Sequence, residues 1–167
     1  KALDDEGLRE NTLVVFFSDN GGAEGNGGAD NGTFRGRKGS VYEGGTRVPA
    51  VMRWPGVLPA GKKSQQVISA MDWFPTLATG LGISPKNDKP FDGRNVWDQI
   101  RGEKEILAPE GMVIARSQTE GSVWDGPWKL VVDPEKTMLF RLEEDPNEEN
   151  DISANHPKVV KRLTAKH

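Results

Sequence analysis

Two neighbouring residues, Asp19 and Asn20, offer hard oxygen ligands directly after an apolar run. A carboxylate beside an amide carbonyl suits Ca²⁺ or Mg²⁺ rather than Zn²⁺. The glycines at positions 21 and 22 let the backbone turn sharply away from such a site. The same residue types also favour an Asx turn or a helix cap that needs no metal. The pattern therefore predicts either a cation site or a simple turn.

A basic turn at residues 34–40 is the second candidate. Arg35, Arg37 and Lys38 place three cations within four residues, separated and followed by glycines. Such a turn suits an anionic substrate, because a lysine is a compact point charge that can meet a phosphate or sulfate oxygen. A solvated basic turn without a ligand is the alternative.

Two other patterns have structural explanations. Glu43 and Arg47 are four residues apart, and we expect them to form an ion pair that braces the turn. Residues 56–62 have the glycine and lysine spacing of a phosphate-binding P-loop. However, Lys63 stands where a Ser or Thr would bind Mg²⁺, and Pro59 lies inside the segment. We therefore reject a P-loop.

The composition excludes several further classes of site. The 167 residues contain no cysteine, so the chain has no disulfide, thiolate zinc site or thiol nucleophile. The 22 basic and 25 acidic residues are interspersed and give a formal net charge of −3, which argues against a nucleic-acid-binding surface. No apolar run approaches the roughly 20 residues that span a bilayer. We expect neither a nucleic-acid partner nor a membrane span.

The candidate metal residues must be positioned by residues 13–17, a continuous apolar run rich in strand-forming residues. A strand of this kind is typical of a buried parallel sheet covered by helices, in which ligands gather at the carboxyl ends of the strands. Residues 21–45 then contain ten of the 20 glycines, which predicts a loop. A loop this long in a compact domain is either functional or disordered.

The rest of the chain predicts a smaller α+β layer. Its expected elements are strands at 48–54 and 65–70, a helix at 72–81, a helical turn at 96–100, an antiparallel meander of strands at 112–116, 128–132 and 138–142, and a helix that begins near Pro157. The predicted fold class is α/β, with one strand of a large sheet and a C-terminal α+β layer.

Residues 11–22, 35–40 and 43–49 together resemble the C-terminal half of the formylglycine-dependent, arylsulfatase-like sulfatases, members of the alkaline phosphatase-like superfamily. Further matches in the same order lie at residues 71–77, 91–94, 128–130 and 139–146. The resemblance implies that residues 1–47 end the catalytic α/β domain and carry its metal and sulfate loop. Residues 48–167 would then form a C-terminal α+β subdomain.

The resemblance also implies roles for single residues. Asp19 and Asn20 match calcium ligands, with Ca²⁺ expected rather than Mg²⁺, and Lys38 matches the catalytic lysine that binds the substrate sulfate. Arg37 receives no catalytic role. The family's nucleophile is a formylglycine made from the cysteine of a C-x-P-S-R motif, which this chain lacks. We therefore expect formylglycine in a missing N-terminal half of the same protein, and an inactive chain without it.

Three functions follow as hypotheses. The first is a sulfuric ester hydrolase that acts on the sulfate ester of a carbohydrate or an aryl alcohol. The second is a phosphate or phosphonate ester hydrolase of the same superfamily, because an Asp-Asn-Gly motif does not distinguish sulfate from phosphate. The third is a binding or interaction module that lacks the nucleophile. The resemblance further implies an exported protein, whether periplasmic, secreted or lysosomal.

Overall fold

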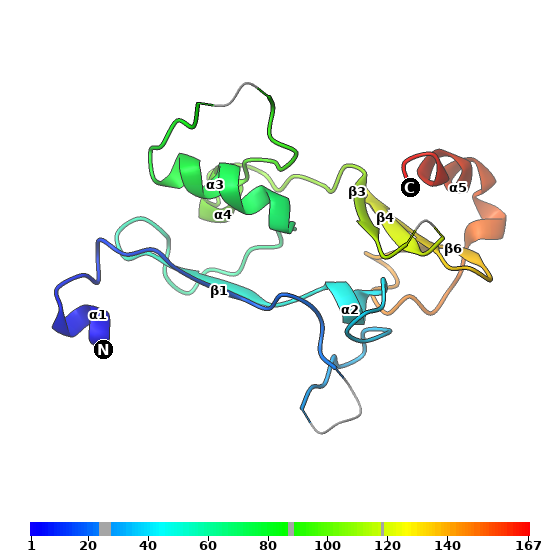
Figure 1. Ribbon diagram of the computed structural model, residues 1–167, viewed down its shortest axis with the longest axis horizontal. Helices are drawn as coiled ribbons and strands as arrows, with labels where there is room; N and C mark the ends of the chain where they lie inside the picture. The colour runs from blue at the N-terminus through cyan, green and yellow to red at the C-terminus, as the bar shows by residue number, and fades with distance from the viewer. Residues whose placement is uncertain (24–27, 87–88, 118) are drawn as a thin grey trace. The chain divides into compact units, whose positions relative to one another are not determined.

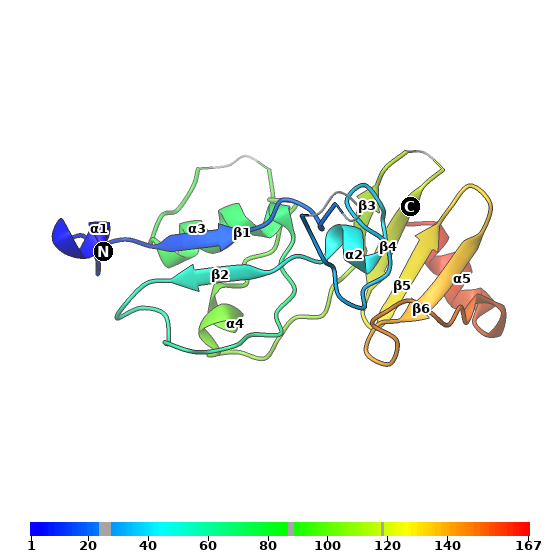
Figure 2. The ribbon, with the colours of Figure 1, turned by 90° about the horizontal axis from the view of Figure 1, so that it is seen from below.

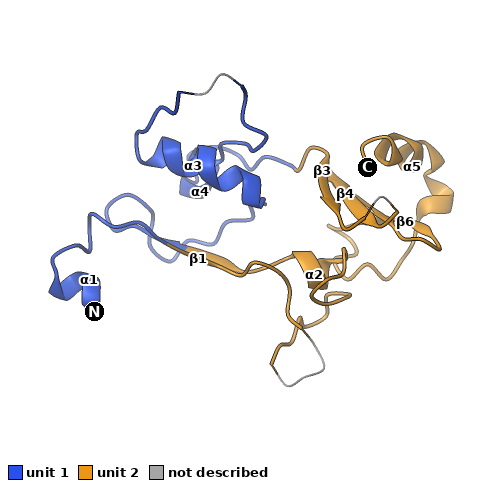
Figure 3. Cartoon of the chain, in the orientation of Figure 1, with its two compact units in different colours: residues 1–14, 52–108 blue, residues 15–51, 109–167 orange. Residues whose placement is uncertain are grey.

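The computed structural model describes residues 1–23, 28–86, 89–117 and 119–167 (Figure 1). The chain divides into two compact units (Figure 3). One unit, here called the helical unit, comprises residues 1–14 and 52–108, and the other, the sheet unit, comprises residues 15–51 and 109–167. Strands β1 (Val14–Phe17) and β2 (Ala50–Arg53) pair with each other in a two-stranded sheet.

The apolar run forms strand β1 as predicted, but the expectation that this strand is buried was wrong for this chain. The side chain of Phe16 is 72% exposed, and those of Val14 and Phe17 are exposed as well. Among the described residues β1 pairs with β2 alone. A strand with one neighbour leaves much of its apolar surface uncovered, whatever its sequence pattern favours.

The helical unit contains α1 (Ala2–Asp5), the 3₁₀ turn η1 (Ala70–Asp72), α3 (Trp73–Gly80) and α4 (Trp97–Arg101). The predicted helix at 72–81 and helical turn at 96–100 are confirmed. Asp72 fixes the entry to α3, because its carboxylate accepts hydrogen bonds from the backbone N–H groups of Ser69 at 2.9 Å and Arg94 at 2.7 Å. In the described part of the chain, no helix is long and apolar enough to cross a membrane.

The strand predicted at residues 65–70 does not form. The Gln66 side chain donates to the Leu107 carbonyl at 3.1 Å and accepts from the Leu107 N–H at 2.8 Å. The Gln66 side chain therefore occupies both backbone groups of Leu107, so Leu107 cannot offer them to residues 65–70 as a neighbouring strand would. The segment ends in η1 instead.

The sheet unit is built on an antiparallel meander in the order β3 (Met112–Ala115), β4 (Gly121–Asp125), β5 (Trp128–Val132) and β6 (Thr137–Arg141) (Figure 2). The three predicted strands are confirmed. Strand β4 was not predicted, because its Gly-Ser start and the Asp125–Pro127 turn signals resemble a loop.

One face of this sheet packs against α5 (Pro157–Thr164), the predicted C-terminal helix, which follows the short turn η2 (Ser153–Asn155). Leu163 of α5 is fully buried against Val123, Leu130 and Leu139. Leu130 and Leu139 are direct cross-strand partners, so they share this face. The helix lies along this side of the sheet in Figure 2.

The opposite face carries the residues that alternate with these. Val131 and Phe140 pack there against Val41, just before the short helix α2 (Glu43–Thr46). Lys129 pairs directly with Phe140 across β5 and β6, so the lysine belongs to the same face. This face of the meander therefore supports α2 and the loop that leads into it.

Candidate functional site

The predicted metal residues, Asp19 and Asn20, lie directly after the carboxyl end of β1. Asp19 is exposed and Asn20 is half-buried. The Ser18 hydroxyl donates to the Asn20 carbonyl at 2.8 Å, and the Gly21 N–H donates to the Gly45 carbonyl at 2.9 Å. The peptide group that joins Asn20 to Gly21 is therefore hydrogen-bonded through both its carbonyl and its N–H, which holds the turn in place.

Gly21 needs to be a glycine because the strand end runs directly against α2. A Cβ at this position would collide with the backbone carbonyl of Gly44. The contact explains why the motif continues with glycine after Asn20, independently of any metal.

The structure brings Lys38 to the same strand end. The Lys38 N–H donates to the Gly22 carbonyl at 2.9 Å, and Gly22 is only three residues after Asp19. The side chain of Lys38 is exposed. Gly36 and Gly39 have φ values of 82° and 87°, a region that suits glycine, so the basic turn requires them on both sides of the lysine.

Asn31 joins the strand end to the basic turn, and sequence reasoning missed it. Its Oδ1 accepts from the Gly22 N–H at 2.8 Å, and its Nδ2 donates to the Gly22 carbonyl at 3.1 Å and the Gly36 carbonyl at 3.4 Å. The only signal in the sequence is an Asn-Gly dipeptide, which favours a turn without indicating a partner.

The donor atoms at the strand end suit a hard cation but form an incomplete set. Asp19 and Asn20 contribute two oxygen-bearing side chains, whereas Ca²⁺ takes about six to eight oxygen ligands. Within the described ranges, no three His, Cys, Asp or Glu side chains gather where they could hold a metal. The residues present therefore fit part of a site for a hard cation.

The predicted ion pair between Glu43 and Arg47 is present, with Arg47 Nη1 3.5 Å from Glu43 Oε2. A closer partner is Lys129, whose Nζ lies 2.7 Å from Glu43 Oε1 and 2.9 Å from Glu148 Oε1. Burial raises the pKa of the Glu148 carboxyl, and the Lys129 charge opposes that rise. Sequence reasoning assigned no role to Lys129 or Glu148, although a lysine in the middle of an apolar strand was a usable signal.

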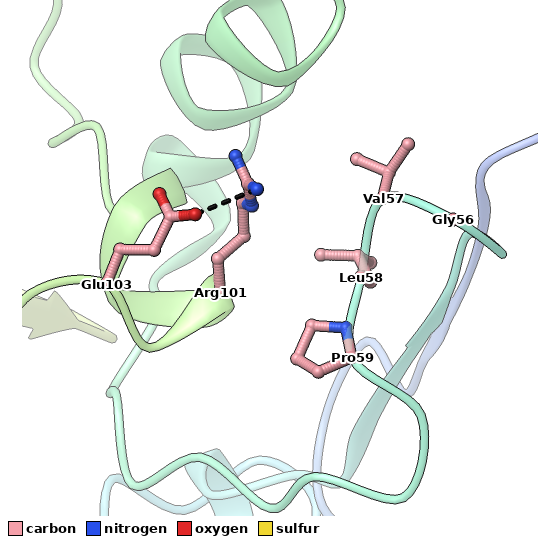
Figure 4. A pocket seen from close by; sticks show the side chains of 6 residues that line it. All are labelled: Gly56, Val57, Leu58, Pro59, Arg101 and Glu103. Atoms are coloured by element: carbon pink, nitrogen blue, oxygen red, sulfur yellow. Dashed lines mark ion pairs between the residues drawn. The ribbon is translucent and has the colours of Figure 1, made fainter.

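A separate, open hollow of about 400 Å³ lies in the helical unit (Figure 4). It is lined by Gly56, Val57, Leu58, Pro59, Arg101 and Glu103. Arg101 and Glu103 form an ion pair at 2.8 Å, and Lys62 donates to the Arg101 carbonyl at 3.0 Å. Lys62, the lysine of the segment with P-loop spacing, therefore already has a protein partner.

Comparison with known proteins places these residues in a family context. Residues 1–83 match the family model described as Sulfatase. The steryl-sulfatase of Rattus norvegicus is 38% identical over 140 residues, which cover 73% of this chain and 24% of that protein. The N-acetylgalactosamine-6-O-sulfatase of Bacteroides thetaiotaomicron is 29% identical over 189 residues, which cover 97% of this chain and 37% of that protein.

A solved structure agrees with these matches. The crystal structure of Ps i-CgsB in complex with k-i-k-neocarrahexaose superposes with a TM-score of 0.88 at 31% identity, over 99% of this chain and 37% of that chain. The likeness confirms the predicted fold class, a portion of the alkaline phosphatase-like α/β fold. The chain spans well under half the length of these relatives. On this evidence, the chain belongs to the sulfatase family.

Proposed function

We propose that this chain supplies part of the active site of a sulfuric ester hydrolase. The observation that carries the proposal is the hydrogen bond from Lys38 N–H to the Gly22 carbonyl, at 2.9 Å. It holds the basic turn against the strand end that bears Asp19 and Asn20. An anionic ester needs both kinds of group, oxygen ligands for a cation and a positive charge for the developing anion. Membership of the sulfatase family supports sulfate rather than phosphate.

The residues have separate roles in this proposal. Asp19 and Asn20 hold Ca²⁺ through their side-chain oxygens, and the bound cation supplies Lewis-acid polarisation of a sulfate oxygen. Lys38 binds the sulfuryl group and stabilises the charge that grows on it in the transition state. Residues 1–47 close the catalytic domain, and residues 48–167 form its C-terminal subdomain.

The nucleophile is proposed to come from a part of the protein that precedes these residues. The 167 residues contain no cysteine from which formylglycine could be made. A formylglycine held there would supply the nucleophilic oxygen for the ester sulfur, with the alcohol as the leaving group, while Lys38 of this chain would bind the sulfuryl group. The chain by itself is therefore expected to be inactive.

The proposed substrate is the sulfate ester of a carbohydrate. The N-acetylgalactosamine-6-O-sulfatase and the structure with a neocarrahexaose match 97% and 99% of this chain, whereas the rat steryl-sulfatase matches 73%. Two matches that cover nearly the whole chain therefore carry carbohydrate names. An aryl sulfate serves as a convenient test substrate. We also propose that the protein is exported, because its resemblance to the sulfatases implies export.

The test uses the complete enzyme, produced from its full reading frame together with a formylglycine-generating enzyme. We expect it to hydrolyse 4-nitrophenyl sulfate and a sulfated galactosamine. Faster hydrolysis of 4-nitrophenyl phosphate would instead support the phosphate ester hydrolase. No hydrolysis of any of the three would support the binding module.

A further inference from the structure

Three charged side chains, Glu43, Lys129 and Glu148, are buried together in the sheet unit. Each is at most 1% exposed. Lys129 Nζ lies 2.7 Å from Glu43 Oε1 and 2.9 Å from Glu148 Oε1. The three residues come from α2, from β5 and from the chain after β6, so distant parts of the sequence meet here. We call these three residues the buried charge cluster.

Packing alone does not require charges at this place. Lys129 pairs with Phe140 on a sheet face whose core is made by apolar residues such as Val131 and Phe140. A buried ion pair is often no more stabilising than well-packed apolar residues of similar size. In addition, Glu148 has a φ of 57°, in the left-handed region that residues other than glycine seldom adopt. Strain and buried charge at one position suggest a role beyond stability.

Glu148 holds the chain on both sides of Lys38. Its Oε2 accepts from the backbone N–H of Glu43 at 2.7 Å, and its backbone carbonyl accepts from Arg35 Nη1 at 3.0 Å. Arg35 precedes Lys38 by three residues and Glu43 follows it by five. One residue therefore binds the turn before and after its catalytic candidate.

The cluster is also connected to the strand end, through α2. The Gly44 N–H donates to the Arg35 carbonyl at 2.7 Å, and the Gly45 carbonyl accepts from the Gly21 N–H at 2.9 Å. A Cβ at Gly21 or Gly44 would collide with a backbone carbonyl, so these segments are in tight contact. A displacement of α2 would therefore move Asn20, which directly precedes Gly21.

We infer that Glu148, supported by Lys129, is a positioning residue that fixes Lys38 relative to Asn20. Glu148 acts through Glu43 and Arg35 and touches neither substrate nor cation. The inference rests on the proposed function for the identity of the site, while the contacts that carry it are independent of that function.

The first test compares Glu148→Ala with Glu148→Gln in the complete enzyme. Glu148→Ala removes the acceptor for the Glu43 N–H and leaves Lys129 and Glu43 as a balanced pair. We expect kcat/KM for an aryl sulfate to fall about 10–100-fold and the Ca²⁺ concentration for half-maximal activity to rise by a similar factor, as for other residues that support metal ligands. Glu148→Gln keeps an acceptor and retains most of the activity.

Asp125→Asn is the matched control. It removes ion pairs with Arg162 and Lys166 in the same unit, on the side of the sheet that α5 covers. The control is expected to lose stability while its Ca²⁺ requirement stays that of the wild type. A merely structural role of Glu148 would make the Glu148→Ala variant behave like this control.

Hydrogen exchange gives a readout that does not depend on activity. In Glu148→Ala we expect faster exchange at the amides of Gly21, Lys38 and Gly44, with β4 and β5 unchanged. Unchanged exchange at these three amides would overturn the inference. If Glu148→Ala does not fold, Glu148→Asp, which withdraws the carboxylate from the Glu43 N–H, carries the same expectation. A wild type that hydrolyses no sulfate ester would defeat the proposed function, and exchange would still decide this inference.

Discussion

The side-chain amide of Asn31 hydrogen-bonds both backbone groups of Gly22. Its Oδ1 accepts from the Gly22 N–H at 2.8 Å, and its Nδ2 donates to the Gly22 carbonyl at 3.1 Å. A neighbouring strand would pair with a residue in the same way. The Gly22 carbonyl also accepts from Lys38 N–H. The backbone of this one residue therefore joins the loop, the strand end and the basic turn.

Replacing Asn31 tests that connection. Asn31→Ala removes both bonds to Gly22, and we expect a loss of about 1–3 kcal/mol in the free energy of unfolding, since the Gly22 N–H loses its acceptor while the Gly22 carbonyl keeps the bond from Lys38 N–H. Asn31→Asp is isosteric but cannot donate to the Gly22 carbonyl. Denaturant titration of both variants measures the effect. Equal stability of wild type and both variants would contradict the assigned role.

Lys38 is the residue whose loss should affect the chemistry most directly. We expect Lys38→Ala in the complete enzyme to lower kcat by about 10²–10³-fold, the usual cost of removing one preorganised group from a developing oxyanion. Arg37→Ala, which removes the neighbouring exposed cation, is the matched control and should retain activity. Steady-state kinetics on an aryl sulfate compares the two. Similar losses in both variants would indicate only a general need for positive charge.

Removal of the metal tests Asp19 and Asn20. Treatment of the complete enzyme with a chelator should abolish sulfate ester hydrolysis, and Ca²⁺ should restore it better than Mg²⁺, because Mg²⁺ demands a stricter octahedral geometry. Asp19→Ala should raise the Ca²⁺ concentration needed for restoration. Asp30→Ala, in the loop that follows, should not, because the Asp30 carboxylate accepts a hydrogen bond from the Gly32 N–H instead. Full activity in chelator would rule out the cation role.

Acid should weaken the attachment of α5 to the sheet through Asp125. Burial would raise the pKa of Asp125, but hydrogen bonds from Arg162 and Lys166, and their charges, lower it to about 2. The unfolded chain therefore binds a proton more readily than the folded one. The ion pairs contribute stability above pH ~4, and this contribution, at most about 2 kcal/mol, disappears between pH ~4 and ~2.

Denaturant titrations of wild type and Asp125→Asn check this expectation. The difference between their free energies of unfolding should be largest near neutral pH and shrink towards zero near pH 2. A difference independent of pH would show that the ion pairs are not responsible.

Elements that bury an apolar face locally were the predictable part of the fold. The strand at 128–132 and the helix that begins at Pro157 both carry a hydrophobic pattern that reports on burial, whereas the run at 13–17 predicted its strand but not its exposure. The strand predicted at 65–70 failed because a side chain, that of Gln66, takes the backbone groups of Leu107. Hydrophobic periodicity does not reveal that a side chain takes the place of a neighbouring strand as a hydrogen-bond partner.

The candidate site likewise contains residues that the sequence could point to and residues that it could not. Asp19, Asn20 and Lys38 have residue types that suggest chemistry, and their roles remain predictions to be tested. Asn31 and Glu148 could not be recognised, because their importance lies in which backbone groups they reach. Glu148 and its partner Glu43 are 105 residues apart, and no local pattern encodes a contact over that distance.

This separation has a consequence for the order of folding. Closing a loop of 105 residues is entropically costly, and such contacts form after the local ones that shorten the effective loop. During synthesis the basic turn leaves the ribosome well before Glu148 does. A nascent chain that ends before residue 148 therefore carries Lys38 on a turn that has not yet acquired its shape. The site is expected to mature only once the meander has assembled.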